Sequence, residues 1–118
     1  MLHLRSLKDV ANLDKKLFTK QHVFSFVYMP GCPWCVSMMD EWNSLVKEPP
    51  KHTLLMMVDF SVLNDLVAAL STKDDRNRFG HVRTVPALDL HRKTGRRAPF
   101  HGERTAKTMR TFVEKRVV

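Results

Sequence analysis

Residues 24–35 read F-S-F-V-Y-M-P-G-C-P-W-C, and they contain both cysteines of the chain. Apart from Ser25, the residues from 23 to 28 are β-branched or aromatic, which predicts a buried strand. From Cys32 to Lys47 apolar side chains recur at helical spacing, and Pro49-Pro50 would end that helix. The two thiols are therefore expected at the junction between a strand and the helix that follows it.

Two thiols at this spacing can close a small disulfide or open it again. A helix start has unpaired N–H groups and the positive end of its dipole, and both favour the thiolate of Cys32. Pro33 suits the first helical position because it has no N–H to leave unpaired there. Cys35, one turn later, is expected to be more buried and to act as the resolving thiol. An inert thiol pair or a static disulfide is the alternative interpretation.

A metal site is not expected. Zinc would need two ligands besides these cysteines. The chain has no third cysteine, and its six histidines do not show the spacing of a zinc motif.

The other elements can be placed by periodicity and turn residues. We predict a short edge strand at 2–4, a helix at 8–19, a central strand at 52–60, a helix at 63–70 and a polar connector at 74–81. We also predict a hairpin, with strands at 87–92 and 98–101 and a turn at Thr94-Gly95, and a closing helix at 105–116. This order predicts an α/β fold, a central mixed β-sheet flanked by helices on both faces, in a single domain of residues 1–118.

Composition restricts the function classes. The 118 residues are 43% hydrophobic, and two cysteines are too few for a disulfide scaffold. No apolar run approaches the ~20 residues of a membrane span, so we expect no membrane role. The first residues lack a secretory signal. If the chain is full length, we expect a cytoplasmic or virion protein; if a targeting segment was removed, the endoplasmic reticulum or secretion fits.

The net charge is +8, and the basic residues concentrate after Lys73. One interpretation is a solvated, soluble surface. The other is a site for an acidic partner or nucleic acid. No aromatic residues interleave with the basic run, so nucleic acid is not expected.

Four pieces of sequence resemble the thioredoxin superfamily, and within it the catalytic domains of protein disulfide isomerases. They are the strand that runs into the C-P-W-C, the V-R-T-V-P-A of residues 82–87, the K-T-G turn of residues 93–95, and the F-H-G-E-R-T of residues 100–105. The resemblance implies that Val85–Pro86 is a cis bond facing the dithiol. It also implies that the Val85 backbone pairs with substrate like an added strand, and that Arg104 tunes the resolving cysteine.

The chain also departs from that family. Phe26 stands where the family buries an acid, Gly31 where it usually has Trp, and Asp40 where a proline kinks the redox helix. The Pro33-Trp34 pair is closer to glutaredoxins, whose glutathione-binding glycine pair is missing here. Trp34 is expected to be exposed beside Cys32, as an apolar platform for substrates.

The resemblance implies a protein disulfide isomerase-like thiol–disulfide oxidoreductase, a monomer without an organic or metal cofactor beyond the redox-active Cys32–Cys35 pair. Its expected partners are proteins with thiols or disulfides, with glutathione or a thiol reductant as electron partner. Two alternatives stay open. One is a thioredoxin- or glutaredoxin-like reductant, and the other is a basic interaction module with a redox-sensing dithiol.

Overall fold

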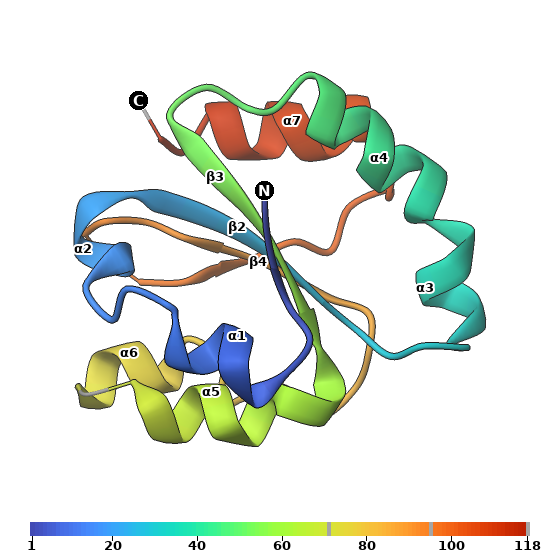
Figure 1. The fold of residues 1–118 in the computed structure, drawn as a ribbon. Coiled ribbons are helices and arrows are strands. Elements are labelled where there is room, and N and C mark those ends of the chain that lie inside the picture. The colour runs from blue at the N-terminus through green and yellow to red at the C-terminus, as the bar shows by residue number, and fades with distance from the viewer. Residues whose placement is uncertain (71, 95, 118) are drawn as a thin grey trace.

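The computed structural model describes residues 1–70, 72–94 and 96–117, and its centre is a twisted five-stranded sheet (Figure 1). The strands are β1 (Leu2–Leu4), β2 (His22–Tyr28), β3 (Thr53–Asp59), β4 (Ala87–His91) and β5 (Ala98–Pro99). Their spatial order is β1-β3-β2-β4-β5. The first three strands are parallel, while β4 and β5 are antiparallel to their neighbours, so the predicted mixed sheet is confirmed.

The central strand β2 separates two hydrophobic cores. Successive side chains of a strand point to opposite faces of the sheet. Val23 and Val27 therefore join one buried cluster, while Phe24 and Phe26 join the other, which also contains Cys35. Because both faces are covered, the buried residues 23–27 of the strand are apolar apart from Ser25.

Helices cover both faces of the sheet (Figure 1). The thiol-bearing face is covered by α3 (Pro33–Ser37), α4 (Met39–Lys47) and α7 (Ala106–Glu114). The other face is covered by α1 (Leu7–Ala11), α2 (Leu17–Lys20), the 3₁₀ helix η1 (Phe60–Val62), α5 (Leu63–Ala69) and α6 (Lys73–Asn77). No helix in the described residues is long and apolar enough to cross a membrane.

The predicted helix at 8–19 is wrong as a single element, because the chain forms α1 and α2 with a loop between them. Asp14 explains the break: its carboxylate accepts the N–H of Lys16 at 2.9 Å. A short side chain that bonds nearby backbone in this way competes with helical hydrogen bonds.

The predicted connector at 74–81 is also wrong in part, because it contains α6. The Thr72 side chain caps this helix by accepting the N–H of Asp75 at 3.0 Å. Asp75 then pairs with Arg78 at 3.0 Å, and both side chains are nearly buried. Charged residues that suggested a loop therefore form a capped, ion-paired turn of helix.

The redox helix is interrupted at Met38 although the family's kinking proline is absent. The Ser37 hydroxyl donates to the Trp34 carbonyl at 3.0 Å. In a continuous helix that carbonyl would accept the N–H of Met38, which instead bonds to Val36. Competition from a serine hydroxyl thus accompanies the break that a proline would otherwise impose.

The C-terminal elements confirm the predicted hairpin and closing helix with shorter bounds. Asp89 pairs with Pro99 and Leu90 with Ala98 across β4 and β5. Gly95 of the predicted turn lies outside the described residues. Thr105 caps α7 by accepting the N–H of Thr108 at 3.2 Å.

A buried histidine lies on the face opposite the thiols. The His91 ring packs edge-to-face against Phe18 and tilted against Phe79, and its Nε2 lies 2.8 Å from the Ser25 hydroxyl. Because that hydroxyl also donates to the Asp89 carbonyl, Nε2–H is the donor to Ser25 and Nδ1 is left as a buried acceptor without a partner. Burial lowers the pKa of His91 well below its usual 6.5, and the charges of Arg78, Arg97 and His81 lower it further.

Stability should therefore fall in mild acid. Below pH 6.5 the unfolded chain binds a proton at His91 that the folded chain does not bind. We expect the unfolding free energy in urea to drop by about 1.4 kcal/mol per pH unit from this residue as pH falls from 6.5 toward 5. A His91→Leu variant should lose most of that slope, and His101→Gln, at an exposed position, should keep it. If the unfolding free energy fell equally steeply with pH in all three proteins, His91 would not be the source of the pH dependence.

Candidate redox site

Cys32 lies at the junction between β2 and α3, as predicted. Its N–H donates to the Met29 carbonyl at 3.1 Å, which closes a tight turn after the strand. Gly31 has φ +80° in that turn, a conformation that favours glycine over residues with a Cβ. Cys32 is the N-cap of α3, and Pro33 occupies the first turn of that helix.

The two sulfur atoms lie close together. Both cysteines are free thiols, and the Cys35 thiol donates to Cys32 Sγ over 2.6 Å. Cys32 Sγ also accepts the backbone N–H of Cys35 at 3.2 Å. Cys35 is only 3% exposed, whereas Cys32 is partly exposed. The pair is therefore placed for disulfide formation, with Cys32 as the more accessible thiol.

The site shifts the pKa values of the two thiols in opposite directions. The hydrogen bond from the Cys35 thiol lowers the pKa of Cys32, and the N–H groups of Cys35 and Trp34 and the charge of Arg104 lower it further. Burial raises the pKa of Cys35 to about 11, and its hydrogen bond to Cys32 raises it too. The arrangement therefore makes Cys32 the more acidic thiol of the pair and keeps Cys35 protonated at neutral pH.

An aromatic core lies behind the thiols in place of a buried acid. Phe26 is fully buried, with ring centroids 5.2 Å from Trp42 and 5.8 Å from Tyr28. Without a buried acid, the sequence leaves water or Asp59 to accept the Cys35 proton, and it favours a local cap or hydrogen bond as the role of Asp59. Asp59 does cap η1, by accepting the N–H of Ser61 at 2.9 Å. Burial raises the pKa of Tyr28, and the charge of Asp59 raises it further.

Exposed apolar side chains surround Cys32. Trp34 is 69% exposed, as expected for a platform, and Met29 is exposed on the preceding loop. Val36 is a residue that the sequence reasoning missed, and it is 62% exposed. Its position outside the apolar stripe of the helix could have revealed it. Met38 is buried and fills the core, as its place in the stripe indicates.

The Val85–Pro86 bond is cis. Val85 packs against both hydrophobic clusters, one of which also contacts Cys32. Within the described turns and loops, the N–H and carbonyl of Val85 have no backbone hydrogen-bond partner.

Arg104 lies in the connection between β5 and α7, and its side chain is exposed. Its positive charge lowers the pKa of both Cys32 and Cys35. The same residue shares a groove with Pro86. Arg104 therefore acts electrostatically on the thiols and also lines the groove beside the cis-proline.

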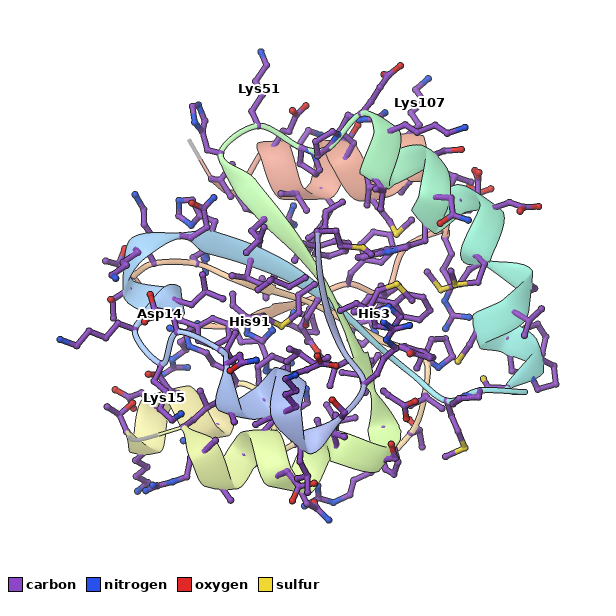
Figure 2. All side chains as sticks on the ribbon, viewed as in Figure 1. His3, Asp14, Lys15, Lys51, His91 and Lys107 are labelled. Carbon is purple, nitrogen blue, oxygen red and sulfur yellow. The ribbon has the colours of Figure 1, made fainter. Side chains whose placement is uncertain are left out.

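The described residues contain no group of three or more histidine, cysteine, aspartate or glutamate side chains that could hold a metal ion. The expectation of a site without a metal or organic cofactor stays a prediction. Figure 2 labels His3 and His91 among the side chains on the ribbon; His91 is buried, whereas His3 is partly exposed. His3 Nε2 lies 2.6 Å from the Tyr28 hydroxyl at the end of β2.

Solved structures match this architecture over almost the whole chain. The Trx4 domain of ERdj5 has 16% sequence identity and a TM-score of 0.68, with 97% of this chain and 92% of that chain covered. The germline-specific thioredoxin Deadhead of Drosophila melanogaster has 18% identity and a TM-score of 0.67, with 99% and 100% covered. The chain has the thioredoxin fold.

Other thioredoxin-fold matches are parts of longer proteins. The J-Trx1 fragment of ERdj5 matches with 18% identity and a TM-score of 0.69, over 97% of this chain and 50% of that one. The chain thus spans half of that fragment. No protein-family model matches the chain, and no curated protein matches it in sequence. The resemblance expected from the four sequence pieces is confirmed at the level of the fold.

The opposite pKa shifts of this thioredoxin-fold dithiol predict unequal alkylation. A Cys35→Ser variant should react with iodoacetamide at neutral pH, with an inflection below the ~8.5 of a free thiol. A Cys32→Ser variant should react far more slowly, because burial keeps Cys35 protonated. The pH dependence of the second-order rate constant measures both effects.

A matched pair of variants tests the hydrogen bond from Cys35, which is the largest cause of the lowered Cys32 pKa. Serine at position 35 keeps a hydroxyl donor for Cys32 Sγ, whereas Cys35→Ala removes it. The Cys32 inflection should therefore lie at higher pH in Cys35→Ala than in Cys35→Ser. Identical profiles for these two variants would show that the Cys35 side chain does not tune Cys32.

Proposed function

We propose that this chain is a thiol–disulfide oxidoreductase that acts on protein disulfides through Cys32 and Cys35. The observation that carries the proposal is the directed contact of the Cys35 thiol with Cys32 Sγ over 2.6 Å. The accessible thiol has a lowered pKa and the buried one a raised pKa, which suits one nucleophile and one resolving group.

The reaction divides into two exchanges. The Cys32 thiolate attacks a substrate disulfide, a Cys32–substrate S–S bond forms, and the other substrate sulfur leaves and takes up a proton. Cys35 then loses its proton to solvent and attacks Cys32 Sγ, which releases the second substrate sulfur. From the form with a Cys32 thiolate the protein gives up two electrons and one proton, the second substrate sulfur leaves as a thiolate, and the reverse sequence oxidises a substrate dithiol.

Substrate contacts follow from the exposed groups around Cys32. Trp34, Val36 and Met29 offer an apolar surface, which suits polypeptide segments near a cysteine. The backbone groups of Val85, which have no hydrogen-bond partner among the described turns and loops, suit pairing with an extended segment. Recognition through backbone and a nonspecific apolar surface fits a protein that accepts many sequences.

An isomerase-like role is favoured over that of a reductant by the electrostatics of Cys32. Arg104 and the N–H groups at the start of α3 stabilise its thiolate, and stabilising the reduced form makes the pair more oxidising. Phe26 removes the negative charge that a buried acid would place behind the thiols. Glutathione or another small thiol would then serve as electron partner, and no cofactor is needed.

Trapping tests the assigned roles. In a Cys35→Ala variant, mixed disulfides between Cys32 and a protein substrate should accumulate, because the resolving thiol is absent. A Cys32→Ala variant should give no adduct, since Cys35 is buried. Non-reducing gels of acid-quenched reactions measure the adducts, and adduct formation through Cys35 alone would contradict the roles.

The redox equilibrium separates the isomerase from the reductant. Equilibration with defined glutathione ratios should give a potential between roughly −230 and −180 mV, above the about −270 mV of thioredoxin. Reactivation of a protein with scrambled disulfides should accompany it. A value at or below about −270 mV without reactivation would favour the reductant. An Arg104→Gln variant should shift the potential toward more negative values, because it removes a charge that stabilises the thiolate.

A further inference from the structure

A groove of about 560 Å³ runs beside the cis-proline. Its walls come from the segment before β4, from β4 and β5 themselves, and from the connection that leads into α7. The charged and titratable residues that line it are Arg83, Arg97, Arg104, His81, His101 and Asp89. Among these described lining residues Asp89 is the sole acid, so the groove is basic.

The one acid in this set is already neutralised. Asp89 is buried, and its carboxylate accepts a hydrogen bond from Arg97 Nη1 at 2.7 Å. Its other oxygen lies 3.2 Å from His81 Nε2. Asp89 therefore positions Arg97 and His81 and leaves no negative charge for the other groove residues.

Two guanidinium groups in the groove keep their charge uncompensated. Arg83 Nη1 donates to the carbonyls of Gly80 at 2.7 Å and Val82 at 3.1 Å, which fix the side chain without an opposing formal charge. Arg104 has no ion-pair partner within the described parts of the chain. Both groups can therefore bind carboxylates of a ligand.

The groove lies beside the cis-proline segment, and neither cysteine is among its lining residues. Pro86 lines it next to Val85, whose backbone has no partner in the described turns and loops. Arg104 lines it as well, and its charge reaches both thiols. A polypeptide that pairs with Val85 while its cysteine meets Cys32 would thus extend along a basic surface.

We propose that this groove selects substrate polypeptides that carry aspartate or glutamate beside the reacting cysteine. The inference rests on the proposed redox function and names the substrate class of that site. Complementary charge raises the rate of encounter and disfavours segments with lysine or arginine at the same positions. Nucleic acid fits the groove less well, because Phe100, its aromatic residue among the described lining, is buried and gives bases no stacking surface.

Three cyclic peptides test the proposal. They are identical, each closed by one disulfide, except that the residues flanking both cysteines are Asp, Asn or Lys. The reduced protein reduces the peptide disulfide, two electrons and two protons pass to the peptide, and the Cys32–Cys35 disulfide forms. Acid quenching and chromatography of the peptide thiols give a second-order rate constant for each peptide.

The comparison of variants isolates the groove from the overall charge of +8. Arg83→Gln should lower the Asp-to-Lys rate ratio about two- to fivefold, the range expected for one solvent-exposed ion pair. Arg83→Glu should lower it further. Lys15→Gln removes the same charge at an exposed residue, labelled in Figure 2, that does not line the groove, and it should leave the ratio unchanged. At about 0.5 M salt the ratio of the unmodified protein should approach one, because surface charges are screened.

The possible outcomes distinguish failure of the acidic preference from failure of the proposed oxidoreductase function. Reaction of all three peptides at equal rates overturns the acidic preference and leaves the oxidoreductase intact. An equal fall of the ratio in Lys15→Gln and Arg83→Gln would assign the effect to net charge and overturn the groove. Inhibition by a short single-stranded oligonucleotide without peptide discrimination would assign the groove to nucleic acid. No reaction with the Asn peptide would overturn the proposed function itself.

Discussion

The sulfur of Cys32 accepts hydrogen bonds that the first turn of α3 cannot satisfy within the helix. The N–H of Cys35 and the thiol of Cys35 both donate to it. This arrangement caps the helix and stabilises negative charge on the sulfur at the same time. It requires the chain to leave β2 through the positive φ of Gly31 and to enter the helix at Pro33. The geometry of the turn therefore determines both where the helix begins and which thiol is acidic.

The sheet supports this turn from behind with apolar contacts. Phe24 and Phe26 of β2 pack against Trp42 of α4, and Cys35 belongs to the same buried cluster. An apolar environment keeps Cys35 protonated, so the difference between the two thiols arises from solvation on one side and hydrogen bonding on the other. The buried polar residues of the central strands, Ser25, Asp89 and His91, form a connected set of hydrogen bonds.

Local pattern explains why much of the fold could be predicted from the sequence. Local structure depends on interactions within a few residues at three places: the run from His22 to Tyr28, the C-P-W-C and the cap at Thr105. Such local patterns can be read from the sequence because tertiary contacts do not override them. The break at Asp14 and the capped turn at Thr72 were missed, because side chain-to-backbone hydrogen bonds overrode the helical or loop-like composition. The basic groove could not be predicted either, since Arg83, Arg97 and Arg104 meet only through the arrangement of β4, β5 and α7.

The two tryptophans of the chain occupy opposite environments. Trp34 stands in solvent beside Cys32, while Trp42 is enclosed among aromatic rings with its indole N–H directed at the sulfur of Met1. Their emission spectra should differ, because an indole in water emits at longer wavelength than one in an apolar core. A water-soluble quencher would act on the first and leave the second. The protein thus carries one intrinsic reporter of the dithiol and another of the core, and changes at the two places can be followed separately without a label.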